Sequence, residues 1–74
     1  MPLLKQYQPI EMKETRLNYF PQAFIADYQL QRVKKVERTS TSHAELRFTI
    51  LTIDNERYEL VQNSATQHWS GRKV

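Results

Sequence analysis

The sequence predicts a mainly β domain: a small antiparallel meander or open barrel of about four to five strands, with an N-terminal arm or short helix. Three observations lead to this fold class. Apolar and polar residues alternate with a period of two in several segments, turn-forming residues separate those segments, and no segment has the apolar stripe of an amphipathic helix. We therefore expect residues 1–74 to form a single small domain, with a possible extended arm at 1–22 and a β-meander at 23–74.

The N-terminal segment fits more than one local structure. Residues 1–9 have the proline-bracketed polar composition of an arm, whereas residues 10–20 are ambiguous. Pro9 at a first helical position, followed by early acidic residues and a late Arg16, favours a short helix. Apolar residues that alternate with charged ones favour a strand or an extended arm instead. We favour the strand or arm, which Pro21 would end.

Residues 23–38 are predicted to form one long strand. The period-two pattern at its beginning places four apolar side chains on one face: Phe24, Ala26, Tyr28 and Leu30. Beyond Leu30 the pattern shifts, because Val33 and Val36 cannot share a face in a regular strand, and a β-bulge between Leu30 and Val36 would restore it. The alternative is a helix capped by Asp27, but its apolar stripe is too narrow.

The clearest strand extends from Ala44 to Ile53, after a polar loop at residues 39–43. Leu46, Phe48 and Ile50 alternate with polar residues, and the apolar residues that follow them occupy the opposite face. A strand with apolar residues on both faces is typical of the centre of a sheet. We therefore expect this strand to have neighbours on both sides.

The C-terminal third of the chain predicts two further strands. Asp54 and Asn55 suit a tight turn, residues 57–62 form a strand with Tyr58 and Leu60 inward, and residues 67–74 close the sheet as an edge strand after a second turn. Phe24, Phe48 and Tyr58 are expected in the core.

The two C-terminal strands, with their Tyr-x-Leu and Trp-containing segments, resemble the ends of small bacterial β domains, some of them similar to C-terminal modules of DNA-repair polymerase-like proteins. The likeness assigns no family.

The positive charge of the chain is concentrated in one short segment. The chain has 11 Lys and Arg against 8 Asp and Glu, a net charge of +3. The segment from Arg32 to Arg38 contains four basic residues and one acidic residue, so it accounts for the whole excess. Such a segment suits an acidic protein surface or the phosphates of nucleic acid. The alternative is an edge strand whose cations discourage aggregation.

The aromatic residues suggest one further candidate for binding. Trp69 lies between His68 and the basic pair Arg72 and Lys73, so it is the best candidate for an exposed ring that stacks on a nucleobase. The alternative is that Trp69 packs in the core, as a domain of this size requires of most of its rings. The predicted binding residues are Arg32, Lys34, Lys35, Arg38, Trp69, Arg72 and Lys73.

Several classes of function have no support in the sequence. The chain has no cysteine, a single glycine and only two histidines, which excludes thiolate metal sites and glycine-rich phosphate loops. No catalytic motif is present, so we expect a non-enzymatic protein without a metal or a cofactor. No segment resembles a signal peptide or a membrane span, and together with the absence of cysteine this favours a cytoplasmic protein without membrane contact.

The expected function is therefore binding. We expect an adaptor domain that docks through its basic strand on an acidic protein partner. The alternative is a small β domain that binds nucleic acid without sequence preference. Because a chain of 74 residues buries only a small core, we also expect self-association into a homo-oligomer as one way to stabilise it.

Overall fold

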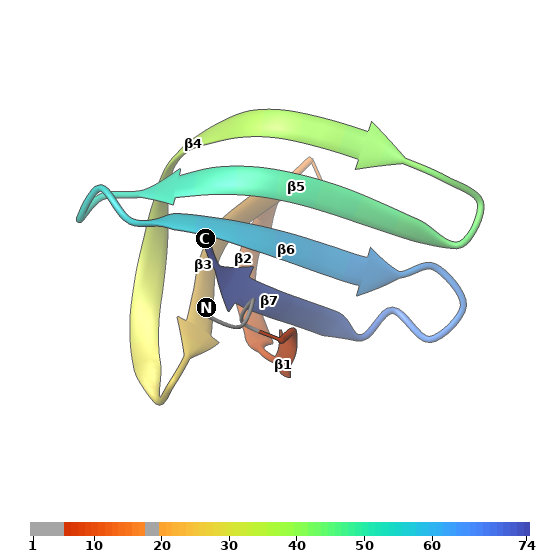
Figure 1. The fold of residues 1–74 in the computed structure, drawn as a ribbon, viewed down its shortest axis with the longest axis horizontal. Coiled ribbons are helices and arrows are strands. Elements are labelled where there is room, and N and C mark those ends of the chain that lie inside the picture. Colours follow the sequence, from red (N-terminus) through yellow and green to blue (C-terminus); the bar gives the residue numbers. More distant parts are fainter. Residues whose placement is uncertain (1–5, 18–19) are drawn as a thin grey trace, which may run out of the picture.

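A computed structural model describes residues 6–17 and 20–74 of the chain. In this part of the chain every regular element is a β-strand, and strands include 72% of the residues. The strands form one antiparallel sheet, in the order β1-β7-β6-β5-β4-β3-β2, that curls into a half-barrel (Figure 1). Their bounds are β1 Gln8–Pro9, β2 Glu11–Arg16, β3 Phe20–Ala26, β4 Gln29–Thr41, β5 Glu45–Thr52, β6 Arg57–Asn63 and β7 Trp69–Lys73. The predicted mainly β class is confirmed, but the predicted number of strands is too low.

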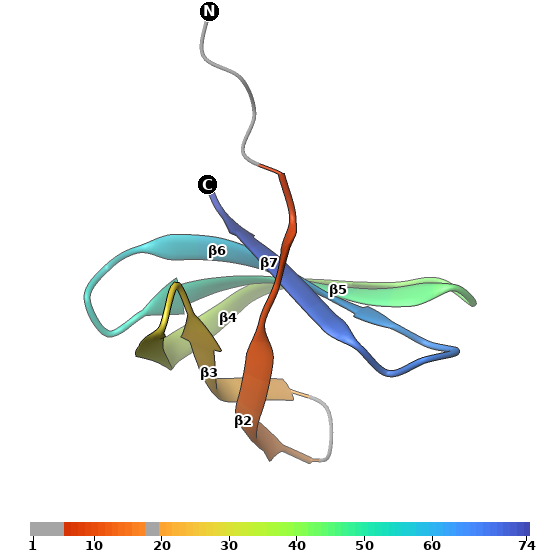
Figure 2. The same cartoon turned by 90° about the horizontal axis from the view of Figure 1, so that it is seen from below.

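The N-terminal segment pairs with both borders of the meander. β1 pairs with β7, β2 pairs with β3, and only Ile10 separates β1 from β2. The sheet therefore curls until its first and last meander strands both contact this segment, which crosses β7 in Figure 2. β2 confirms the strand that we favoured over a helix within residues 10–20, but the segment is not a free arm, because Ile10 and Met12 pack against the core. Pro21 does not end the segment as predicted, since it lies within β3 and pairs with Thr15. Residues 1–5 of the predicted arm lie outside the described part of the chain.

The predicted long strand at residues 23–38 is in fact a hairpin. β3 ends at Ala26 and β4 begins at Gln29, and the two residues between them, Asp27 and Tyr28, have positive φ angles of 51° and 63°. Positive φ at both central residues is what a two-residue type I′ turn requires. The turn changes the faces that we predicted: Leu30 pairs with Ile25 on the outer face, and Tyr28 is fully exposed.

β4 bends and passes from one half of the curled sheet to the other. It pairs with β3 up to Arg32 and with β5 from Val33 onward. The register with β5 shifts between Val33 and Lys35 and again between Val36 and Arg38, as in β-bulges. The first shift lies within the interval where the sequence predicts a bulge, so that prediction is confirmed. A bulge bends its strand and leaves one unmatched residue, here Lys34 and then Glu37.

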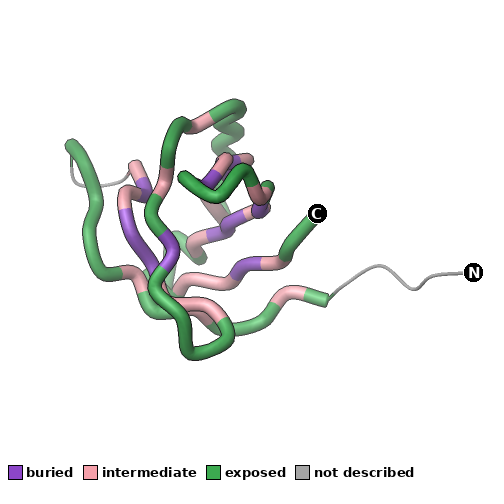
Figure 3. The backbone as a smooth tube through the Cα atoms, turned by 90° about the vertical axis from the view of Figure 1, so that its left-hand side faces the viewer, coloured by how far each residue is buried: buried purple, intermediate pink, exposed green. Residues whose placement is uncertain are grey.

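The core lies inside the curl of the sheet, as the purple segments of Figure 3 show. It consists of the buried side chains of Phe24, Phe48, Ile50, Tyr58 and Leu60. The rings of Phe24 and Tyr58 meet edge to face, with 5.3 Å between their centroids. The three aromatic residues that we predicted to be inward are therefore confirmed as core residues. β5 lies between β4 and β6, so its predicted central position is also confirmed.

The connections between the C-terminal strands follow the local sequence. Asn55 has a φ of 64° in the turn between β5 and β6, and the Asn63 carboxamide accepts hydrogen bonds from the backbone amides of Ala65 and Thr66. Two details differ from the prediction. β4 continues through most of the predicted loop, to Thr41, because that segment pairs with β5. β7 is also not a bare edge strand, since β1 covers part of it.

Candidate functional site

The four basic residues of β4 form an exposed basic strip, which we define as Arg32, Lys34, Lys35 and Arg38. All four side chains are exposed. Lys35 lies opposite Leu51 and Arg38 opposite Thr49, whereas Lys34 is the unmatched residue of the first bulge. Regular alternation would have aligned Arg32, Lys34 and Arg38 on one face, but the bulges break it. The register instead places Lys35 and Arg38 on the outer face of the sheet.

The basic strip is not neutralised by the rest of the described chain. Ion pairs in residues 6–17 and 20–74 involve other cations, and Lys34 reaches only the Asn55 carboxamide, at 3.4 Å. The acids that form these pairs, Glu45, Glu56 and Glu59 among them, are held by cations elsewhere on the sheet. The cations that they engage are Lys13, Arg47, Arg57, Arg72 and Lys73.

The one acidic residue within the strip is itself engaged by another strand. Glu37 accepts hydrogen bonds from Arg57 of β6, at 2.5 Å from Nε and 3.0 Å from Nη2. These hydrogen bonds lower the pKa of the Glu37 carboxyl below its usual value, and they raise the pKa of Arg57. Glu37 therefore stays ionised and paired with Arg57, and it forms no ion pair with Lys35 or Arg38 within the described residues.

A cleft of about 460 Å³ opens beside the strip, where β4 leaves β3. We call it the basic cleft. Lys34 and Lys35 line it from β4, Arg16 lines it from β2, and Phe20 and Val36 contribute apolar surface. The sequence did not single out Arg16 for binding, because residues 10–20 had no assigned partner strand. Pairing of β2 with β3 brings it to this side of the sheet.

The predicted C-terminal binding residues lie apart from the basic strip. Cross-strand pairing links Arg38 to Arg72 through Thr49 and Glu59, so three strand spacings, about 14 Å, separate them. Arg72 forms an ion pair with Glu59 at 3.0 Å and lies over the ring of Tyr7, 4.8 Å from its centroid. Lys73 forms an ion pair with Glu56.

Trp69 is a half-buried ring at the border of the core. It stacks on Phe48 with 5.9 Å between the ring centroids and an interplanar angle of 29°. Its contact with Phe48 agrees with the alternative that Trp69 packs in the core and is not an exposed stacking ring. The structure thus brings together the four cations of β4 and leaves Trp69, Arg72 and Lys73 outside that group.

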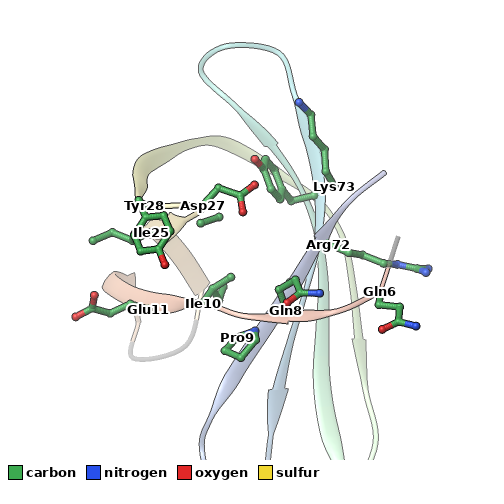
Figure 4. Close-up of a pocket in the computed structure, with 13 residues that line it drawn as sticks. Gln6, Gln8, Pro9, Ile10, Glu11, Ile25, Asp27, Tyr28, Arg72 and Lys73 are labelled. Carbon is green, nitrogen blue, oxygen red and sulfur yellow. The ribbon is translucent and has the colours of Figure 1, made fainter. Parts of the chain in front are cut away.

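An apolar patch lies next to the basic strip on the outer face, which we define as Ile25, Tyr28, Leu30 and Ile53. Leu30 pairs directly with Ile25, and the backbone amide of Ile53 donates to the carbonyl of Arg32 at 3.0 Å. Leu30 is 51% exposed and Ile53 57% exposed. Figure 4 shows Ile25 and Tyr28 on one wall of an open cavity of about 810 Å³, with Lys73 and Arg72 on another.

Other kinds of site have little support in the described residues. His43 and His68 are exposed in separate turns, and nowhere in residues 6–17 and 20–74 do three His, Cys, Asp or Glu side chains gather as metal ligands would. The same residues include no helix with the length and apolarity to cross a membrane. No protein-family model, curated protein or solved structure matches the chain. Its function is therefore inferred from its own geometry.

Proposed function

We propose that this chain is a non-enzymatic binding domain whose basic strip docks on an acidic protein partner. One observation carries the proposal: Arg32, Lys34, Lys35 and Arg38 are exposed and form no ion pair within the described residues, although five acids of the same sheet are paired with other cations. A partner carboxylate therefore has no internal ion pair to displace. Electrostatic complementarity of this kind guides and orients association.

The surroundings of the strip favour a protein over nucleic acid. Ile53 of the apolar patch lies directly beside Arg32 in the sheet, and Tyr28 of the same patch is fully exposed. Exposed apolar groups next to arginine are typical of protein interfaces, where Tyr and Arg contribute much of the binding energy. Single-stranded nucleic acid needs a series of exposed rings on which successive bases stack. Tyr28 is one exposed ring, but Phe24, Phe48 and Tyr58 are buried.

The alternative function is sequence-independent binding of nucleic acid. Exposed cations spaced along an extended strand, with Arg16 on the opposite wall of the basic cleft, suit the phosphates of a backbone. In this alternative we had expected Trp69, Arg72 and Lys73 to contribute to the same surface. Their position three strands away, with Arg72 and Lys73 already paired, gives that expectation no support.

Fluorescence-anisotropy titrations test both functions with the same protein. The probes are a Glu-rich peptide, a single-stranded oligonucleotide and a duplex, each at about 50 and 200 mM salt. The variant Lys35→Gln/Arg38→Gln removes two cations of the strip and keeps much of each aliphatic stem. The matched control, Lys13→Gln/Arg47→Gln, removes the same formal charge from cations that are paired within the sheet.

The proposal requires the peptide to bind, with an affinity that falls at high salt. We expect the strip variant to lose about tenfold in affinity, which corresponds to about 1.4 kcal/mol for two contacts, and the control to change it little. Equal losses in both variants would show that only net charge matters. Binding of oligonucleotides but not of the peptide would establish the alternative function, and no binding of any probe at low salt would exclude both.

A further inference from the structure

We propose that the open edge of β4, from Val33 to Thr41, binds an acidic peptide as an added β-strand. This segment is called the β4 edge below. The inference rests on the proposed function, and it specifies how the partner is held: by main-chain hydrogen bonds along the strand, with the basic strip selecting acidic side chains.

The strand pairing shows where the edge is open. β3 pairs with β4 only as far as Arg32, and from Val33 onward β5 is the one strand in the described chain that pairs with it. In Figure 1 this half of β4 forms the upper border of the sheet. At about 3.4 Å per residue the open edge is about 30 Å long. Backbone donors and acceptors along such an edge are free to pair with another extended chain.

The charges around the β4 edge favour an acidic occupant. Lys34, Lys35 and Arg38 belong to the edge itself, and Arg16 lies across the basic cleft. None of these four residues forms an ion pair within residues 6–17 and 20–74, and Glu37 is held by Arg57. An added strand with carboxylate side chains would therefore meet several unneutralised cations and one acid that is already paired.

The basic cleft supports an alternating pattern in the occupant. Side chains of a strand point to its two faces in turn. Val33 and Val36 line the cleft and pack against the core. Lys35 and Arg38 lie on the outer face by register, and Lys35 also borders the cleft. A peptide that alternates small apolar with acidic residues would place its apolar side chains towards the cleft and its carboxylates beside the outer cations.

A second copy of this chain is a poorer occupant of the β4 edge. Antiparallel pairing of two β4 edges about a twofold axis would bring Lys34, Lys35 and Arg38 of one copy against the same residues of the other. Like charges on directly opposed strands are destabilising. Cations and bulges also occur on edge strands to prevent pairing with other chains. If that were their only role here, no peptide would bind to the β4 edge.

Backbone N-methylation of the peptide distinguishes strand addition from side-chain docking. The parent probe is a peptide of alternating Glu and Val, about nine residues long, to match the open edge. Two isomers carry N-methyl groups at every second residue, one on each edge of the extended peptide. The valine face of the peptide is expected to lie over the cleft. Once that face and the direction of the peptide are set, only one of its two backbone edges can face β4.

Anisotropy titrations of the three peptides are combined with amide hydrogen exchange of the protein. Strand addition predicts that one isomer loses at least about tenfold in affinity, which is the equivalent of one or two hydrogen bonds. The other isomer should bind like the parent, and alternate amides between Val33 and Thr41 should exchange more slowly in the complex. Amides of β6 serve as an internal control, because β6 has strands on both sides.

The outcomes separate the two proposals. If the parent binds with the expected dependence on salt and on Lys35 and Arg38, but both isomers bind equally well or lose equally, docking on the strip stands and strand addition is wrong. If the Glu-rich peptide binds at low salt but the parent does not, strand addition is wrong and docking on the strip stands; if neither peptide binds, both proposals fail. If the parent peptide makes the protein dimerise, and amide exchange slows at the β4 edge of both copies, the occupant of the edge is a second chain. That result would overturn the inference.

Discussion

Substitution of Gly71 by alanine tests how the curled sheet closes. Gly71 lies on β7 where it pairs with Leu60 of β6 and with Gln8 of β1, and it is buried. A methyl group at this position would lie 2.8 Å from Leu60 Cδ2 and 3.4 Å from Ile10 Cγ2. The first distance is too short for two carbon atoms, and Leu60 is completely buried, so its side chain has little room to move.

Two physical effects of Gly71→Ala have opposite signs, so the measurement decides between them. Intrinsic preference favours the variant by about 0.5–1 kcal/mol, because glycine loses the most backbone freedom when a strand forms. Overpacking of a buried position costs about 1–3 kcal/mol. Since the nearest neighbour is fully buried, we expect overpacking to dominate and the free energy of unfolding to fall by about 1–2 kcal/mol.

Urea denaturation of a double-mutant cycle tests whether Leu60 is the side chain that clashes with the methyl group added at position 71. Leu60→Val removes the Cδ atoms and should by itself cost about 1 kcal/mol. In that background Gly71→Ala should cost little, which gives a coupling energy of about 1–2 kcal/mol between the two sites. A stabilised or unchanged Gly71→Ala variant would refute the close packing of β7 against Leu60, and additive losses would show that Leu60 is not the group that clashes.

Three further predictions concern single side chains. Tyr28→Gly should raise the free energy of unfolding by about 1 kcal/mol, because Tyr28 has a φ of 63°; a decrease on thermal denaturation would contradict this. Burial raises the pKa of the Tyr58 phenol, so the stability that it contributes is fully present below about pH 10 and is lost as the pH rises further. Tyr58→Phe should flatten that alkaline decline in a denaturation series, and an unchanged slope would assign the decline to other groups, among them Lys73, whose pKa is also raised. The hydrogen bond from Arg57 lowers the pKa of Glu37, so its stabilising contribution is present above the usual carboxyl pKa of 4.5 and is lost as the pH falls. Glu37→Gln should therefore weaken the acid dependence of stability more than the control Glu14→Gln, and equal effects would argue against the Glu37–Arg57 pair.

Local sequence determined the C-terminal half of the fold. The alternation around Phe48 and Ile50 and around Tyr58 and Leu60 indicates inward faces, which the structure confirms. These strands are neighbours both in sequence and in space, and short turns join them. Under those conditions period-two patterning is sufficient to predict which side chains are buried.

The same patterning failed where local preference and tertiary pairing disagree. Asp27 and Tyr28 carry no Asn-Gly or Asp-Gly signal, so the type I′ turn between β3 and β4 was missed and Leu30 was assigned to the wrong face. The N-terminal segment was ambiguous because β1 pairs with β7, near the other end of the chain, and because the register of β2 with its neighbour β3 shifts twice. A segment whose partners are distant in sequence leaves no local signal of its position.

The candidate site was likewise predictable from the sequence in one part and not in another. The sequence by itself determined that the excess positive charge lies in residues 32–38, since counting charges requires no structure. Only the tertiary structure decided that these cations form no ion pair within the described residues, that Arg16 joins them, and that Arg72 and Lys73 pair elsewhere. Ion pairs act over a few ångströms, so whether a charge is neutralised depends on which strands become neighbours. That neighbourhood is set by the curl of the sheet and by the bulges of β4.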